Sequence, residues 1–407
     1  MYSIRISGYT QVFAREVAML AQAKARTIAL QSQMQTQNIP FALFTDESSI
    51  AYLAGFWGYL GIEFGRPTML VVPAVGAPTV ITPLMESEMV GAMTWVEDIR
   101  VWEDFGSNSW QAALAKILGA ILGPRPESIW LELSTVPAIV RNYLDQDFAA
   151  VPLCDIAPVL GKQRIIKSAL EIEIMSQTGI IAGAMMQAAH ESLAEGVPEY
   201  ESALAVINAG TKKAAGFLTD TGWDQFVSPM IHNLQILQSG SDTSMVHRRA
   251  SVRTYKRADP VYFCFCNMAQ FKQYKLGFDR MFHIGEVTDQ AAQVQLAAIE
   301  AQQAAIAAIK PGVSAQQVAA AANAVYQKRG YETGYRTGRS IGVAYLEAPE
   351  LKHGDKTILQ AGMTFAVDGG ISIDGETAGR IGDSIVVTQT GCEYLTQYPR
   401  QLLVTNS

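Results

Sequence analysis

The sequence predicts an α+β protein of two domains, a smaller α/β domain over residues 1–160 and a larger domain over residues 161–407. Three observations support this. The chain has 407 residues, 49% of them hydrophobic, which is enough for two separate cores. Helical and β-rich segments alternate up to about residue 160, as is typical of a sheet covered by helices. After residue 160 come long helical segments and then β-rich runs that are interrupted by glycine.

Composition excludes several function classes. The net charge is −7, and the basic residues are scattered, so nucleic acid and anionic membranes are poor partners. No apolar run reaches the roughly 18 residues needed to span a bilayer, and no signal peptide is readable at the start. The four cysteines form no CxxC motif. We therefore expect a reduced, cytoplasmic protein.

The elements of the first domain follow from periodicity and breakers. Apolar residues at helical spacing indicate helices, and β-branched runs indicate strands. Asp46 is a suitable residue to begin a helical turn. The predicted elements are helices over residues 12–38, 46–53 and 110–122, and strands over residues 41–45, 68–72, 79–81 and 128–131.

The second domain begins with a long helix after a boundary at 155–165. Lys310-Pro311-Gly312 ends a later helix, and Ser314 is positioned to cap the next one. The predicted helices cover residues 169–194, 200–213, 288–309 and 314–329, with strands near 260–283.

Residues 334–387 carry the clearest motifs. Short β-rich runs over residues 364–367, 371–373 and 384–387 are separated by Gly369-Gly370 and by Asp374-Gly375. Glycine pairs and Asp-Gly are typical of the turns of antiparallel hairpins. The stretch therefore predicts hairpins.

Three segments of this stretch resemble signatures of the pita-bread family. They begin at Gly338, Gly362 and Arg380, and the run from Gly161 to Ser168 is similar to the entry to that family's catalytic domain. The family contains methionine and Xaa-Pro aminopeptidases, prolidases and the metal-free amidinohydrolase creatinase. The resemblance implies a pita-bread catalytic domain over residues 161–407 and a creatinase-like N-terminal domain over residues 1–160.

In the family's peptidases, a His, two Glu and two Asp bind a dinuclear metal centre. The matching positions of this chain hold Cys266, Gly277, Arg339, Asp368 and Gly382. Two divalent ions need several anionic ligands, and one carboxylate beside a guanidinium does not provide them. We therefore expect no metal and no cofactor.

These departures resemble creatinase, which the chain is similar to over its whole length. Phe64 and Arg66 match a Phe-Gly-Arg segment whose Arg binds the substrate carboxylate, and Lys352 maps onto a second carboxylate-binding position. The resemblance implies that these residues bind substrate. Arg339 is a further candidate for substrate binding.

The catalytic assignments also come from this resemblance. His247 matches the catalytic His, and Asp279 and Asp368 map onto two Glu that hold a guanidinium. Two carboxylates can bind a guanidinium bidentately. A neutral imidazole can take a proton from water and return it to the departing nitrogen.

Each of these residues also has an ordinary interpretation. His247 fits a solvated loop, Asp368 fits a turn, and Cys264 and Cys266 fit a strand core. The two remaining alternatives are an exposed pair of Asp279 with Arg280, and a structural ion pair of Arg339 with Glu347 or Asp383.

The sequence therefore predicts a metal-independent hydrolase of a C–N bond in a small guanidino or amidino acid, with creatine as the leading candidate. Three alternatives stay open: a prolidase-like metallopeptidase with altered ligands, an enzyme similar to ectoine hydrolase, and an inactive binding homologue. The resemblance also implies a homodimer in which Arg66 reaches the partner's site. A small zwitterionic substrate would suit this set of charges.

Overall fold

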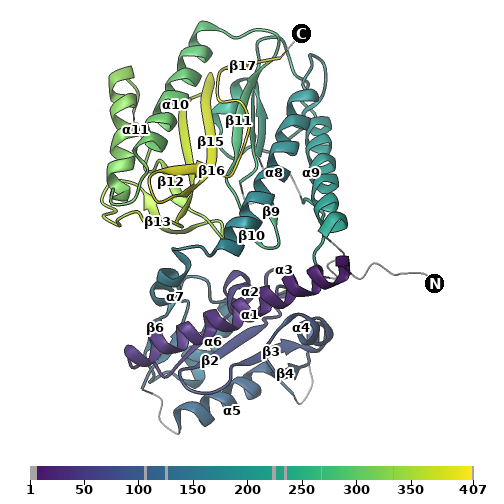
Figure 1. Ribbon diagram of the computed structural model, residues 1–407, viewed down its shortest axis with the longest axis vertical. Helices are drawn as coiled ribbons and strands as arrows, with labels where there is room; N and C mark the ends of the chain where they lie inside the picture. The colour runs from purple at the N-terminus through teal and green to yellow at the C-terminus, as the bar shows by residue number, and fades with distance from the viewer. Residues whose placement is uncertain are drawn as a thin grey trace, which may run out of the picture. The chain divides into compact units, whose positions relative to one another are not determined.

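The computed structural model describes residues 7–104, 108–123, 127–221, 226–232, 236–266, 268–332 and 334–405. The chain divides into two compact units, Met1–Gln163 with Asp224–Phe226, and Arg164–Trp223 with Val227–Ser407 (Figure 1). Each unit has its own sheet, and the α+β class predicted from the sequence is confirmed. No helix in the described ranges is long and apolar enough to cross a membrane.

The first unit is built on a six-stranded mixed sheet with the order β4-β3-β2-β1-β5-β6. Strands β1, β2 and β3 are buried along their whole length, as expected where helices cover both faces. The strands are β1 (Phe41–Phe44), β2 (Met69–Pro73), β3 (Thr79–Pro83), β4 (Asp98–Trp102), β5 (Ile129–Leu131) and β6 (Leu153–Asp155).

Helices α1 and α5 lie on opposite sides of this sheet (Figure 1). The predicted helix over residues 12–38 is α1, which spans Ser7–Thr36. Asp46 accepts a hydrogen bond from the Ser49 N–H and so caps α2, as the sequence predicts. The other helices are α2 (Glu47–Ala54), α3 (Leu60–Phe64), α4 (Ser87–Met93), α5 (Trp110–Leu122), α6 (Ala138–Asp147) and α7 (Ala157–Arg164).

The second unit contains a nine-stranded sheet. Its main path is β13-β12-β14-β15-β11-β8-β7, with β16 paired to β15 and β17 paired to β11. Strands β9 (Gln270–Phe271) and β10 (Tyr274–Lys275) form a separate hairpin. The nine strands are β7 (Ile236–Ser239), β8 (Pro260–Cys264), β11 (Asp279–His283), β12 (Gly338–Ser340), β13 (Glu347–Leu351), β14 (Thr364–Ile373), β15 (Thr377–Val387), β16 (Cys392–Tyr394) and β17 (Leu403–Val404).

Four long helices surround this sheet: α8 (Ala169–Glu191), α9 (Glu199–Thr221), α10 (Asp289–Ala308) and α11 (Ala315–Arg329) (Figure 1). Helix α10 packs on β14 and β15. The core beneath it contains Val294, Phe365 and Ile385, all nearly inaccessible to solvent.

One turn prediction is wrong. Gly369 and Gly370 lie inside the ten-residue strand β14, and the hairpin turn falls at Asp374 and Gly375 instead. A Cβ on Gly369 would stand 2.2 Å from the carbonyl oxygen of Ala298 in α10. The glycine is therefore required by the close approach of a helix, and not by a turn.

Buried ion pairs tie β11 to β15. Arg280 is 1% exposed, and its Nη2 lies 2.9 Å from Asp383 Oδ1. Arg400 and Gln302 also donate to the Asp383 carboxylate. The alternative of an exposed Asp279–Arg280 pair is therefore wrong, because Arg280 points into this network. Removing one member would leave a buried charge without compensation.

His283 ends β11 and is fully buried, and neither of its ring nitrogens has a hydrogen-bond partner among the described residues. Burial lowers the pKa of its imidazole from 6.5 to about 4. Between these values the unfolded chain binds more protons than the folded chain. The folded protein therefore loses stability as the pH falls through this window.

We expect His283→Leu to weaken this loss, because leucine does not titrate. The free energy of unfolding should fall less between about pH 7 and pH 4, by about 3 kcal/mol relative to the wild type. Urea unfolding at several pH values would measure the difference. The exposed His353, changed to Leu, is the control, and an unaltered pH dependence in His283→Leu would contradict the assignment.

Candidate active site

A cavity of 550 Å³ lies in the second unit, lined by residues of strands β7, β8, β11, β12, β14 and β15 and of helix α11. Three predicted catalytic residues, His247, Asp279 and Asp368, line this one cavity, together with Arg339. The sequence positions of these four residues span more than a hundred residues, so the fold brings them together. The other polar residues of the lining include Tyr262, Cys264, Cys266, Tyr326, Arg336, Tyr345 and Arg380.

Arg339 is the buried cation of the cavity. It lies on β12, is 4% exposed, and its Nη1 stands 2.5 Å from Asp368 Oδ2. Its Nη2 donates to Cys266 Sγ at 3.4 Å, and the guanidinium lies 4.4 Å from the centre of the Tyr345 ring. Burial lowers the pKa of Arg339, but the Asp368 carboxylate and the thiols outweigh that effect and raise it above its usual value.

The partner of Arg339 is therefore Asp368. The ion pair with Glu347 or Asp383 that the sequence left open as an alternative is wrong. Glu347 instead forms a buried ion pair with Lys167, at 2.9 Å, and Asp383 belongs to the Arg280 network. Strand β14 runs between β12 and β15. That strand order places Asp368 next to Arg339, and it cannot be read from sequence spacing.

Asp279 has a carboxyl group that is nearly sealed from solvent. The residue is 4% exposed, and its Oδ1 has no hydrogen-bond partner among the described residues. Burial, followed by the negative charges of Asp368 and Cys266, raises the pKa of this carboxyl well above its ordinary value. Asp279 is therefore disposed to hold a proton and to donate it.

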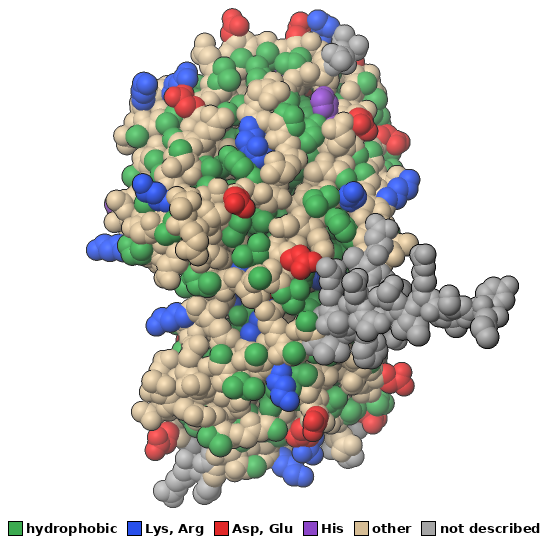
Figure 2. Space-filling model, in the orientation of Figure 1, with side chains coloured by type: hydrophobic (Ala, Val, Ile, Leu, Met, Phe, Trp, Pro, Cys, Tyr) green, Lys and Arg blue, Asp and Glu red, His purple; other side chains and the backbone are tan. Residues whose placement is uncertain are grey.

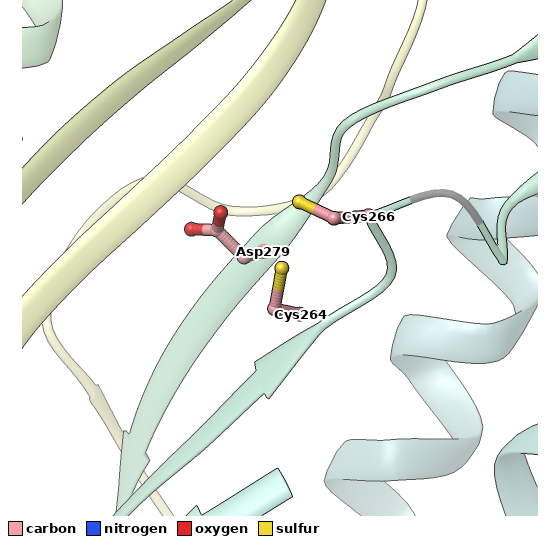
Figure 3. Close-up of side chains that lie close together, drawn as sticks. All are labelled: Cys264, Cys266 and Asp279. Carbon is pink, nitrogen blue, oxygen red and sulfur yellow. The ribbon is translucent and has the colours of Figure 1, made fainter. Parts of the chain in front are cut away.

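Two thiols stand beside this carboxyl. Figure 3 shows Cys264 at the end of β8, Cys266 in the chain just beyond it, and Asp279 on the adjacent strand β11. One ligand atom from each residue lies within 4.8 Å of the other two. Arg339 touches this group through Cys266. A fixed cation so close opposes the binding of a metal cation at the same place.

Comparison with known proteins identifies the family. Residues 173–389 match the profile of Metallopeptidase family M24, and residues 26–166 match the Creatinase/Prolidase N-terminal domain. The chain belongs to this metallopeptidase family. The pita-bread catalytic domain and creatinase-like N-terminal domain expected from the resemblance are therefore confirmed.

Several known proteins are similar over nearly the full chain. The agropine synthesis cyclase of Rhizobium rhizogenes is 28% identical over 389 residues, 92% of this chain and 96% of the relative. The probable dipeptidase PepE of Mycobacterium tuberculosis is 28% identical over 403 residues, 97% of each chain. The structure of dipeptidase PepE from Mycobacterium ulcerans has a TM-score of 0.77 at 26% identity, covering 95% of this chain and 98% of that one.

The five positions that the family resemblance assigns to metal ligands do meet in space. Cys266 contacts Arg339, and a Cβ on Gly277 would stand 3.2 Å from Arg339 Nη2. Asp368 faces Gly382 across the β14–β15 ladder. The alignment of motifs is thus consistent with the geometry, and Arg339 occupies the centre of the constellation.

These residues do not fit a dinuclear metal centre. Gly277 and Gly382 offer no ligand atom, and Asp368 is already neutralised by Arg339. A Cβ at Gly382 would stand 2.4 Å from Asp279 Oδ2, so the Asp279 carboxyl would have to move to admit a side chain there. The side chains of Asp279 and Ala366 thus occupy the space beside Gly382 and Gly277 that metal ligands would need.

His247 lies in an exposed turn after the 3₁₀ helix Gly240–Ser244. The adjacent Arg248 holds this turn, with its Nη1 2.8 Å from the fully buried Glu199 and its Nε 2.8 Å from Asp242. Gln238 donates to the carbonyl oxygen of Arg248 at 3.1 Å. The exposure agrees with a solvated loop, yet the anchored turn keeps His247 at the cavity.

Lys352 is placed elsewhere. It lies in the turn beyond β13, is 42% exposed at the side chain, and pairs with Glu350 at 2.8 Å. It does not belong to the residues that line the cavity. Arg336 does line the cavity, and its Nη1 stands 3.5 Å from the same Glu350. Arg336, and not Lys352, is therefore the cation beside Glu350 that lines the cavity.

Phe64 and Arg66 belong to the first unit. Phe64 ends α3, is 59% exposed, and meets Tyr59 edge-on with ring centroids 6.1 Å apart. Arg66 Nε lies 2.6 Å from Asp104 Oδ2, with both side chains partly exposed. Their role in substrate binding stays a prediction.

Sequence reasoning missed Tyr262, Arg336, Tyr345 and Arg380. Two of them carried a usable signal, because side chains alternate along a strand. Tyr262 is two residues from Cys264 on β8, and Arg380 is two residues from Gly382 on β15. Arg336 and Tyr345 flank β12 in loops, where no periodicity applies.

Proposed function

We propose that this chain is a metal-independent enzyme that acts on an acyl or C–N centre of a small, anionic substrate, in the cavity around Arg339. The observation that carries the proposal is the buried guanidinium itself, held by Asp368 at the meeting point of the five former ligand positions. A fixed cation can stabilise charge that develops on a substrate oxygen or nitrogen, as a metal does in a metalloenzyme. It does so without a bound ion.

The charge of the cavity supports an anionic substrate. Arg336, Arg339 and Arg380 line it, whereas the Asp368 charge is taken up by Arg339 and Asp279 favours its neutral form. Arg380 is bonded to the neutral hydroxyl of Ser372. Arg336 is paired with Glu350, so Arg380 is the charge that would attract and orient a substrate carboxylate.

Proton transfer is assigned to His247 and Asp279. His247 is exposed and lines the cavity, so its imidazole can exchange protons with water there and act as a general base. Asp279 can protonate a departing nitrogen because burial favours its acid form. Arg339 would stabilise the negative charge that forms between these two steps.

The names of the relatives leave two outcomes of such a reaction open. One relative is called a cyclase and another a probable dipeptidase, at the same 28% identity. Attack by water gives hydrolysis, and attack by a group of the substrate itself gives a ring. The same cavity can support both, so the substrate decides between them.

Hydrolysis of a creatine-like guanidino or amidino acid is the second candidate. It is favoured by the meeting of His247, Asp279 and Asp368 in one cavity. The Arg339–Asp368 ion pair weighs against it, because that carboxylate already binds a guanidinium of the protein. The substrate screen described below also tests whether the chain acts on an ectoine-type substrate or is an inactive binding homologue.

The first test is whether the protein binds metal and needs it for activity. Purified protein should contain no stoichiometric Mn, Co, Fe or Zn, and turnover of any substrate found in a screen should survive chelator. The screen would include creatine, guanidinoacetate, ectoine, Pro-dipeptides and small amides that bear a carboxylate. Two bound ions per chain, with activity lost on chelation and restored by metal, would establish the metallopeptidase alternative instead.

We expect His247→Ala to lower kcat by about 10²–10⁴-fold, the usual contribution of general acid–base catalysis. KM should change much less, because substrate binding is assigned to the arginines. Steady-state kinetics over a pH series would measure both constants. His353→Ala, an exposed histidine outside the cavity lining, is the matched control. Near-normal turnover in His247→Ala would reject the assignment.

We also propose that the chain forms a homodimer in which Arg66 of one copy serves the site of the other. The exposed aromatic pair of Tyr59 and Phe64 beside it suits a contact surface. Inactive Arg66→Ala and His247→Ala chains, combined in one dimer, should then recover part of the activity. Purified heterodimers that stay inactive would place Arg66 in its own subunit's site or in none.

A further inference from the structure

The thiol of Cys266 has a position that the proton-transfer scheme above does not use. It is partly exposed and lines the cavity, whereas Cys264 is buried. Cys264 pairs directly with Asp279 across the β8–β11 ladder, and all three side chains converge (Figure 3). Both cysteines thus line the cavity beside a carboxyl, and Cys266 is the more exposed of the two.

The contacts of Cys266 favour its thiolate. Arg339 Nη2 donates to Sγ at 3.4 Å, and the same guanidinium is fixed on its other side by Asp368. A cation in contact with a cysteine stabilises the thiolate. A hydrogen bond from the Cys264 thiol and the charge of Arg339 both lower the pKa of Cys266, whereas burial raises the pKa of Cys264. The contact with Arg339 is thus the feature that favours negative charge on Cys266.

Asp279 supplies an independent sign of a ligand. Its Oδ1 is buried and has no hydrogen-bond partner among the described residues, and the residue lines the cavity. A buried polar atom without a partner is costly, and native structures retain such atoms where a ligand or a reaction uses them. A group bound beside Cys266 would lie within reach of this carboxyl, since their ligand atoms lie within 4.8 Å of each other.

We propose that Cys266 is the nucleophile of the reaction and forms a covalent thioester or amidino-thioester with the substrate. This rests on the proposed function, because it names the attacking group of that same site. Arg339 has two roles in it. It keeps the sulfur ionised, and it stands next to the atom on which negative charge develops.

The steps balance without any redox change. Cys266 Sγ attacks the carbonyl or amidino carbon, and the electron pair of the double bond moves to its oxygen or nitrogen, near Arg339. The C–N bond then breaks, and the departing nitrogen takes the proton of Asp279. Water, or a hydroxyl of the substrate, attacks the thioester and gives its proton to His247, which returns it to Asp279. The C–S bond breaks with its electron pair on sulfur.

A soft metal ion bound by Cys264, Cys266 and Asp279 is the competing interpretation. The three residues offer two sulfurs and one oxygen, a donor set that zinc accepts. The geometry favours the nucleophile, because Arg339 already contacts the outer sulfur. Two of the three groups also favour their protonated forms, and a metal would have to displace both protons.

Alkylation by iodoacetamide tests the thiol without a known substrate. In the full-length protein with a reductant present, mass mapping should show Cys266 labelled at least about 10-fold faster than Cys154 or Cys392, with its rate rising at a pH below that of an ordinary thiol. This comparison needs no variant. Equal rates at the three thiols, or a rate at Cys266 that chelator raises in protein carrying stoichiometric zinc, would overturn the proposal.

The cation is tested by Arg339→Gln, which should slow the labelling of Cys266 by about 10-fold and move its pH dependence upward. Arg257→Gln is the matched control, since Arg257 forms a solvent-exposed ion pair with Glu286. Unchanged labelling in folded Arg339→Gln would overturn the role given to the guanidinium.

Acyl transfer is tested with 4-nitrophenyl acetate. The wild type should release nitrophenolate in a burst and carry one acetyl group on Cys266, removable by hydroxylamine, whereas Cys266→Ala should give neither and Cys392→Ala should give both. Acetylation of lysines alone would overturn the proposal. Chelator-resistant turnover that survives in Cys266→Ala would reject the nucleophile and leave the proposed function standing. Chelator-sensitive turnover would reject the proposed function even if Cys266 were acetylated.

Discussion

The ion pair between Arg339 and Asp368 is the interaction on which the rest of the site depends. A guanidinium that is 4% exposed needs a compensating charge, and removing one partner of such a pair typically costs about 3–5 kcal/mol. The surroundings are arranged accordingly. Tyr345 presents its ring to the cation, and Cys266 accepts from its second nitrogen. Gly277 leaves the space that the guanidinium requires.

A second constraint holds the reactive groups still. Asp383 is fully buried and binds Arg280, Arg400 and Gln302, which ties β11 to β15 and to α10. Asp279 neighbours Arg280 on β11, so the network fixes the backbone that carries the Asp279 carboxyl. The anchoring of Arg248 to Glu199 does the same for the turn that carries His247. Rigid charge networks therefore surround a cavity whose own groups are free to react.

The sequence predicted the parts that local chemistry determines. Asp46 caps a helix, and Asp374-Gly375 makes a turn. The five positions that the resemblance aligns with metal ligands lie close together. Sequence reasoning failed where the same residue type can be required for two different physical reasons. Gly369 was interpreted as a turn residue, but close packing of α10 requires it. The partner of Arg339 and the displacement of Lys352 from the cavity depend on strand order and on where β13 ends, and residue spacing contains neither.

The proposed function requires a metallopeptidase scaffold to act without metal. A metal centre does two things in a hydrolase: it polarises the bond under attack and it generates a nucleophile from water. Arg339 can replace the first role, since a fixed cation polarises a carbonyl. It cannot replace the second, because a guanidinium does not ionise water. Under the proposed metal-independent mechanism, the chain therefore needs a nucleophile of its own. Cys266, in contact with that arginine, is the side chain in the cavity lining best suited to be one.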